Sequence, residues 1–347
     1  MLRILYAGSP EAAAIPLMHL GKAEAEGKGF TIVGVLTNPP SAQGRSKALI
    51  PTPVAQAAQK LEAELGRSIP VLTPEKLDAA ARDAVAELQP DLLVCFAYGK
   101  IFGPKFLSLF PLGGINLHPS LLPLYRGCAP IPAAILDQQA ETGVSVQKLA
   151  LEMDSGNILS QVTLPLAGTE TADSLLLQAA EIGGKQLEDV ILHAAQAGSL
   201  PEGIPQDGSK ATYCQMMKKE EGCICWNDSA AAIDAKIRAF TPWPGAFTGA
   251  LGTTLKIHQA KVYQQELPAH IRSAYPEAPV PGTVLGMDKA HGILVQTGEG
   301  ILCITNLQWQ AKKAMSWKDF MNGSPNLLAA VVPAIKGMSI GRFYERF

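Results

Sequence analysis

Residues 91–97 of the chain, DLLVCFA, form a short apolar run that is typical of a buried strand. Similar runs occupy 2–7 and 30–37, and segments of helical composition occupy 51–65 and 75–88. Strands that alternate with helices predict right-handed crossovers and a mostly parallel, Rossmann-like α/β sheet. In such sheets, chemistry gathers beyond the carboxyl ends of the strands. The turn after the first strand, AGSPEAA, has one glycine where a dinucleotide fingerprint has three, which disfavours NAD binding.

Length and composition exclude several classes of protein. The 347 residues suggest two domains, and 47% hydrophobic with 17% charged residues exclude a disordered polyelectrolyte. None of the six cysteines falls in a CxxC pair, so we expect no thiolate zinc site and no metal. The N-terminus does not resemble a signal peptide, and no apolar window is long enough to span a membrane. We therefore expect a cytoplasmic protein with no membrane partner.

The texture of the sequence changes after residue 198. Residues 169–197 have the composition of a last long helix, and the Gly- and Pro-rich stretch 199–210 is typical of a linker. We predict a catalytic domain over 1–198, a linker over 199–210 and a second domain over 211–347. The second domain should hold a helix at 229–239 and a small β-barrel, because short β-prone runs are separated by Gly- and Pro-containing turns. These runs lie at 254–258, 282–285, 292–297 and 300–307.

The net charge of −2 hides an uneven distribution. Residues 1–207 contain 14 Lys and Arg against 21 Asp and Glu, a net charge of −7. Residues 208–347 contain 15 basic and 10 acidic residues, a net charge of +5. A basic second half can attract an anionic partner that the total charge would not suggest.

The densest chemical signal lies in residues 113–132, GGINLHPSLLPLYRGCAPIP. Asn116 and His118 are two residues apart directly after an apolar run, so they should point to one face at the carboxyl end of a strand. An amide can donate a hydrogen bond to a developing oxyanion, and an imidazole can move a proton near neutral pH. The alternative is that His118 is a hydrogen-bonded structural histidine in a loop.

A second candidate segment is 142–156, TGVSVQKLALEMDSG, in which an alternating run precedes a turn that contains Asp154. Asp154 could orient His118 or a water molecule. The Asp-Ser-Gly sequence also suits an ordinary Asx turn, which stays the competing interpretation.

Together, the two segments resemble the folate-dependent formyltransferase family, whose pattern reads N-x-H-x-S-L-L-P, then R-G-A-P-I, then D-x-G. The resemblance implies that Asn116, His118 and Asp154 catalyse transfer of a formyl group from 10-formyltetrahydrofolate to an amine. It also implies that the SLLP segment binds folate. That segment consists of Ser120, Leu121, Leu122 and Pro123.

Further blocks are similar to the branch of the family that acts on charged initiator tRNA. They include YAGSPEAAAIPL at the start, FAYG at 96–99, and ATY, KEE and PWP beyond the linker. The resemblance implies formylation of the amino group of methionyl initiator tRNA by a monomer with an OB-like, tRNA-binding second domain. Two departures near the site are Leu124, which replaces a common Arg, and Cys128, which replaces a common Ala.

An anionic tRNA needs a basic surface, which the second half of the chain can supply. Arg45 and Lys47 in a glycine-containing loop, and Lys312 and Lys313 in the second domain, are the candidate tRNA contacts. The alternative functions are a formyltransferase that acts on a sugar-nucleotide amine and a 10-formyltetrahydrofolate hydrolase. Other basic residues of the second half could extend the surface: Lys210, Lys218, Lys219, Lys236, Arg238, Lys256, Lys261 and Lys318.

Overall fold

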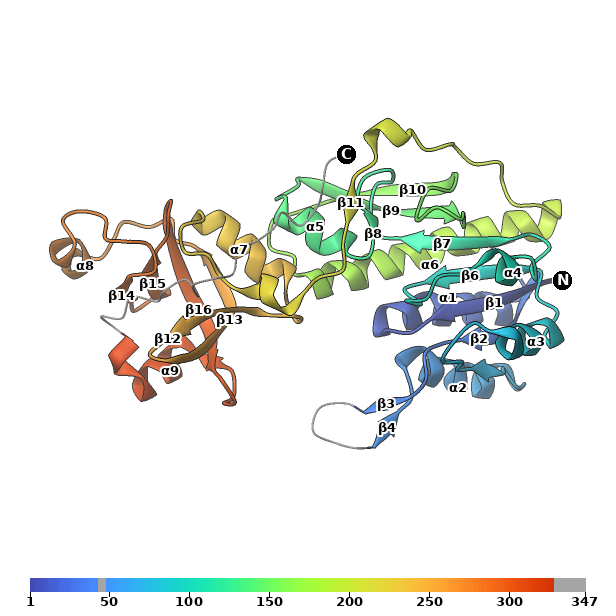
Figure 1. The fold of residues 1–347 in the computed structure, drawn as a ribbon, viewed down its shortest axis with the longest axis horizontal. Coiled ribbons are helices and arrows are strands. Elements are labelled where there is room, and N and C mark those ends of the chain that lie inside the picture. The colour runs from blue at the N-terminus through green and yellow to red at the C-terminus, as the bar shows by residue number, and fades with distance from the viewer. Residues whose placement is uncertain (43–47, 328–347) are drawn as a thin grey trace.

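The structure of the protein is a computed structural model, in which residues 1–42 and 48–327 are described. Figure 1 shows an α/β domain and a smaller β-rich domain placed side by side along the long axis of the molecule. This arrangement confirms the predicted fold class, a Rossmann-like domain followed by a smaller β domain.

The first domain is built on a seven-stranded sheet in the order β10-β9-β7-β6-β1-β2-β5. The five strands from β7 to β5 pair in parallel, whereas β9 and β10 run antiparallel and extend the β7 edge. The three runs predicted as buried strands correspond to β1, β2 and β6. The strands are β1 (Leu2–Gly8), β2 (Phe30–Leu36), β5 (Val71–Leu72), β6 (Leu92–Phe96), β7 (Gly114–His118), β9 (Glu141–Lys148) and β10 (Ile158–Pro165).

Local capping explains where the helices begin and end. Thr52 accepts a hydrogen bond from the Ala55 amide at the start of α2, and left-handed Gly66 follows its end. Thr171 and Ser174 form a capping box that starts α6. The helix expected over 75–88 is shorter, because Asp78 caps it from outside. The helices are α1 (Glu11–Ala25), α2 (Pro53–Leu65), α3 (Ala79–Glu87), α4 (Pro104–Leu107), α5 (Pro130–Leu136) and α6 (Ala172–Ala197).

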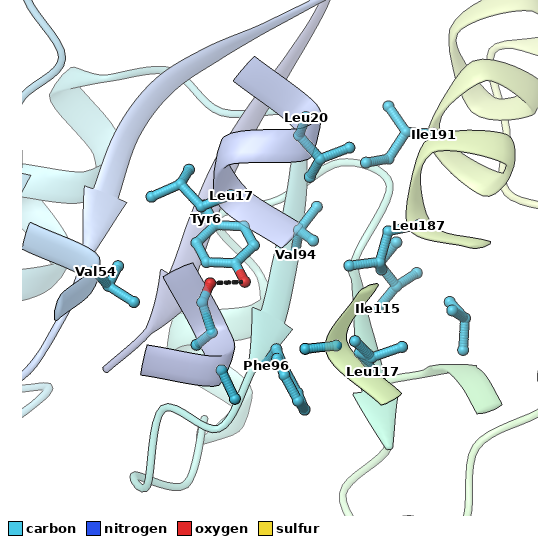
Figure 2. Packing of buried hydrophobic residues seen from close by; sticks show 14 of the residues in the cluster. Tyr6, Leu17, Leu20, Val54, Val94, Phe96, Ile115, Leu117, Leu187 and Ile191 are labelled. Carbon is cyan, nitrogen blue, oxygen red and sulfur yellow. Dashed lines mark hydrogen bonds between the residues drawn. The ribbon is translucent and has the colours of Figure 1, made fainter. Parts of the chain in front are cut away.

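The sheet is buried on both faces because alternate residues of each strand point to opposite layers. Ile4 and Tyr6 of β1 belong to the cluster that includes residues of α1 and α6, and Figure 2 shows this packing. Leu5 and Ala7 face the other layer, which contains stacked aromatic rings. The buried Tyr6 hydroxyl donates to the carbonyl of Ala13 at 2.6 Å. Burial raises the pKa of Tyr6 well above its ordinary value.

The second domain contains an antiparallel sheet in the order β12-β13-β16-β15-β14. The long strand β16 pairs with β13 along one edge, and with β15 and then β17 along the other. The predicted strands correspond to β13 to β16, and the predicted helix is α7, capped by Ser229. The strands are β12 (Ala246–Ala250), β13 (Thr253–Val262), β14 (Val284–Asp288), β15 (Gly292–Gln296), β16 (Ile301–Trp309) and β17 (Met315–Ser316). The helices are α7 (Ala230–Ala239), α8 (Ala269–Ala274) and α9 (Trp317–Gly323).

The two domains pack against each other through α7, which contacts α5. Ala239 and Phe240, at the end of α7, are buried in the hydrophobic cluster of the first domain. The Arg238 guanidinium donates to the carbonyl of Glu170 at 3.2 Å. The predicted boundaries at 198, 210 and 211 stay predictions, and residues 328–347 of the predicted second domain lie outside the described residues. Within the described residues, no helix combines the length and apolarity that a bilayer span requires.

A buried carboxylate joins α6 to α1. Glu188 of α6 is 3% exposed, and its oxygens lie 2.8 Å from Lys28 Nζ and 2.6 Å from His19 Nε2. Burial by itself would raise the pKa of Glu188, but the hydrogen bonds from Lys28 and His19 outweigh burial and hold it below the ordinary value of 4.5.

We predict that Glu188→Ala lowers the free energy of unfolding at pH 7 by about 2 kcal/mol, because it removes hydrogen bonds between charged groups. Urea unfolding measures this. The difference from wild type should shrink as pH falls, since a carboxylate with a depressed pKa stabilises the fold above its unfolded pKa and stops doing so below its folded pKa. The control is Asp189→Ala, which removes a carboxylate that is 59% exposed. An equal loss in both variants would contradict the prediction.

Candidate active site

Strand β7 places Asn116 and His118 on one face at its carboxyl end, as their two-residue spacing predicts. Asn116 lies between Cys95 of β6 and Gln147 of β9 in the sheet, and His118 pairs with Ser145. His118 is 4% exposed, whereas Asn116 is only partly buried. The Asn116 side chain makes no hydrogen bond to the described part of the chain, so its amide is free to meet a ligand.

The two ring nitrogens of His118 have different surroundings. Nε2 lies 2.8 Å from the carbonyl oxygen of Tyr125. A carbonyl only accepts, so Nε2 carries the proton of this hydrogen bond. Nδ1 faces Asp154 Oδ2 at 3.6 Å, which is longer than a hydrogen bond. In this structure, the backbone of Tyr125 holds the ring directly, and Asp154 faces the nitrogen that remains.

Asp154 is itself fixed by two hydrogen bonds. Its Oδ1 accepts from Gln147 Nε2 and its Oδ2 accepts from the Gly127 amide, both at 2.8 Å. The carboxylate is 14% exposed and lies within reach of His118, as the resemblance implies. Asp154 is therefore more than the first residue of an ordinary Asx turn.

Strained backbone gathers around these side chains. Tyr125 and Asp154 have φ values of 58° and 52°, in the left-handed region that non-glycine residues seldom occupy. Ala97, directly after β6 at the same edge of the sheet, has a φ of 50°. Such conformations persist only where surrounding contacts enforce them, and they cluster at functional sites.

The loop that follows His118 contains the predicted folate-binding segment. Ser120 and Leu122 are buried, and Ser120 Oγ donates to the carbonyl of Leu124 at 2.6 Å. Leu121 and Pro123 are partly exposed. The buried pair shapes the loop, so a folate contact through a side chain would fall on the other two residues.

Buried polar groups of neighbouring elements brace this loop, and the sequence analysis did not single them out. Ser145 Oγ donates to the carbonyl of Ser120 at 2.7 Å and accepts from Gln161 Nε2 at 2.8 Å. Gln147 contacts Asp154, as described above. The signal for both is the run VSVQ, in which Ser145 and Gln147 alternate with apolar residues in a strand buried on both faces.

Gln206, in the predicted linker, is a further residue that the sequence did not reveal. Its Oε1 accepts from Nε and Nη2 of Arg126 at 3.0 and 2.9 Å, and its Nε2 contacts the Asp154 carbonyl at 2.8 Å. Nothing in the Gly- and Pro-rich stretch distinguishes Gln206 from a solvated linker residue.

The candidate tRNA contacts are distributed over both domains. Arg45 and Lys47 lie outside the described residues. Lys312 and Lys313 are exposed in the turn between β16 and β17. The expectation that Lys236 joins this basic surface is wrong, because it is 8% exposed and donates to the carbonyl of Cys223 at 3.0 Å. Burial lowers the pKa of Lys236.

Neither a metal cluster nor a deep cavity marks the site within the described residues. No group of three or more His, Cys, Asp or Glu side chains there could hold a metal ion. A cavity of about 330 Å³ lies elsewhere, between the domains, and Glu170, Asp234 and Arg238 line part of it. The site is therefore defined by its chemistry: an amide donor, an imidazole and a fixed carboxylate, a set suited to acyl transfer.

This chemistry at the carboxyl edge of a Rossmann-like sheet is that of a formyl transferase. The formyl transferase family model matches residues 2–191, and the model of the formyl transferase C-terminal domain matches residues 216–325. The chain belongs to this family. Methionyl-tRNA formyltransferase of Treponema denticola is 47% identical to the chain over 329 residues, which cover 94% of this chain and 98% of the relative.

Solved structures show the same fold at low sequence identity. The N-formyltransferase from Helicobacter canadensis, in complex with folinic acid and dTDP-3-aminofucose, is 17% identical with a TM-score of 0.60, covering 88% of this chain and 99% of that chain. HypX from Aquifex aeolicus in complex with tetrahydrofolic acid is 15% identical with a TM-score of 0.57. That match covers the whole of this chain and 51% of HypX.

We predict that Ser145→Ala lowers the free energy of unfolding by about 1–3 kcal/mol, because it leaves the Ser120 carbonyl and the Gln161 amide without a partner. Urea unfolding measures the loss. Hydrogen exchange of the Leu122 amide, which donates to Ser145 Oγ, should become faster. The control Ser108→Ala removes an exposed hydroxyl and should change stability by less than about 0.5 kcal/mol. Unchanged stability and exchange in Ser145→Ala would show that the serine does not brace the loop.

Proposed function

We propose that the protein transfers a formyl group from 10-formyltetrahydrofolate to the free amino group of methionyl initiator tRNA, a step that supports translation initiation. The observation that carries the proposal is the fixed constellation of Asn116, His118 and Asp154 in a chain that is 47% identical to methionyl-tRNA formyltransferase over nearly its full length. All three residues come from one chain, which supports a monomer. We place this monomer in the cytoplasm.

The reaction begins when the amine of the charged tRNA attacks the formyl carbon on N10 of the folate. The carbonyl oxygen gains negative charge in the tetrahedral intermediate. Asn116, whose amide is uncommitted, donates a hydrogen bond to that oxygen. Collapse of the intermediate breaks the bond from carbon to N10, and N10 takes a proton as it leaves.

We assign that proton transfer to His118 through Nδ1, because Nε2 is committed to the Tyr125 carbonyl. Asp154 Oδ2 stabilises the imidazolium form from 3.6 Å. The partly exposed Leu121 and Pro123 lie beside this reaction centre and supply apolar contacts for folate. No step of this scheme needs a metal ion.

The alternative functions receive less support. The sugar N-formyltransferase fold is shared at 17% identity only, whereas the tRNA enzyme is similar through both domains. A hydrolase would need water in place of the amine, and no feature of the described site favours water. One assay separates the three functions: transfer of the formyl group to charged initiator tRNA, to a sugar-nucleotide amine or to water. Wild-type protein that forms no formyl-methionyl-tRNA would overturn the proposal.

We predict that Asn116→Ala lowers kcat by about 10²–10³, because it removes one donor to the oxyanion. KM for both substrates should change little, since the bond forms mainly in the transition state. Steady-state kinetics measures this, and urea unfolding checks that the variant folds. Asn322→Ala, which changes an exposed asparagine of the second domain, is the control. Wild-type turnover in Asn116→Ala would remove this residue from the mechanism.

We predict that the double variant Lys312→Ala with Lys313→Ala raises KM for tRNA and leaves KM for the folate unchanged. Loss of phosphate contacts should also make log KM for tRNA depend less steeply on log salt, by about one per contact. Lys289→Ala, which removes an exposed charge from a different turn, is the control. An unchanged salt slope in the double variant would exclude the two lysines from the tRNA interface.

A further inference from the structure

The segment that joins the two domains lies against the candidate active site along residues 204–214, which we call the strap. Ile204 forms an antiparallel bridge with Ile158 of β10. At its other end, β11 (Tyr213–Cys214) pairs in parallel with β8 (Arg126–Gly127). Between these anchors, the short 3₁₀ helix Gly208–Lys210 is exposed. The strap is therefore fixed at both ends beside the site.

The strap holds the residue that anchors His118. The backbone amide of Tyr125, whose carbonyl accepts from His118 Nε2, donates to Thr212 Oγ1 at 2.8 Å. The amide of the next residue, Arg126, donates to the Thr212 carbonyl at 2.8 Å. These bonds hold Tyr125 in its left-handed conformation, and with it the ring of His118.

The strap also holds the residue that faces His118 from the other side. Gln206 Nε2 contacts the carbonyl oxygens of Asp154 and Gly156 at 2.8 and 2.7 Å, on either side of Ser155. It lies 3.2 Å from Oε1 of Gln147, the residue that donates to Asp154 Oδ1.

The other end of the Gln206 amide is fixed by a buried cation. Arg126 is 4% exposed and donates twice to Gln206 Oε1. Its third contact is the Tyr213 hydroxyl, at 3.0 Å. A planar guanidinium that donates twice fixes the orientation of the amide, so that Nε2 must face the Asp154 loop.

We propose that Gln206 is a positioning residue for Asp154, and that the strap sets the geometry of the His118–Asp154 pair from the segment that leads into the second domain. The inference rests on the proposed function for its kinetic test. Gln206 touches neither substrate nor reacting atom. Its effect passes through Asp154, whose left-handed backbone it holds from the carbonyl side.

The first test compares Gln206→Ala with Glu202→Ala, a control in the same segment whose exposed side chain has no hydrogen bond within the described residues. Gln206→Ala should lower kcat by about 10- to 100-fold, because a small displacement of a catalytic group is enough for such a loss. KM for both substrates should stay within about twofold of wild type, and Glu202→Ala should match wild type. Wild-type kcat in Gln206→Ala, or a loss confined to KM, would overturn the inference.

A double-mutant cycle separates positioning from a general structural effect. If Gln206 acts through Asp154, Gln206→Ala should lower kcat much less in an Asp154→Asn background than in wild type. A fully additive loss would overturn the inference. Gln206→Glu keeps an acceptor for Arg126 but cannot donate to the two carbonyls, so it should fail to rescue kcat.

A third measurement does not depend on activity. In ¹⁵N-labelled protein, the ring signals of His118, assigned from His118→Asn, should shift in Gln206→Ala and stay unchanged in Glu202→Ala. Unshifted signals would overturn the inference. Failure of the proposed function would appear separately, as wild-type protein that forms no formyl-methionyl-tRNA.

Discussion

The hydrogen bond from His118 Nε2 to the backbone carbonyl of Tyr125 constrains the whole of the candidate site, because it leaves the ring only one nitrogen for chemistry. That nitrogen, Nδ1, is the one that faces Asp154. The loop between His118 and Tyr125 must therefore turn back sharply, and it does so with Tyr125 in a left-handed conformation. The buried hydroxyls of Ser120 and Ser145 close this turn from within. A flexible loop could not hold an acceptor at 2.8 Å from a buried imidazole.

The sheet supplies the rigid part of this arrangement. Parallel strands end at one edge, so β6 and β7 deliver Ala97, Asn116 and His118 together, and Figure 1 shows β7 pointing toward the second domain. The antiparallel strand β9 then brings Gln147 beside Asn116 and leads into the turn with Asp154. Helices α1 and α6 pack on one face of this sheet and are joined through Glu188. Packing far from the site thus fixes the strand ends on which the chemistry depends.

Much of this could be predicted from the sequence, because the signals are local. Short apolar runs identified the strands β1, β2 and β6, and the spacing of Asn116 and His118 placed them on one face. The catalytic role of Asp154 came from a family resemblance, because Asp-Ser-Gly alone suits an ordinary turn. The contributions of Tyr125 and Gln206 could not be predicted, since one acts through its carbonyl and the other lies in a segment with linker composition. Contacts of this kind carry no local pattern, and only the fold brings them together.

The strap changes what the division into two domains means for the proposed reaction. The first domain carries the net negative charge and the site, while the basic second half would hold the anionic tRNA. A simple tether would let these two tasks proceed independently. The segment between them instead contacts both partners of His118, Tyr125 through Thr212 and Asp154 through Gln206. Because the same backbone continues into the domain proposed to bind tRNA, any load on that domain is transmitted first to the two groups that orient the imidazole.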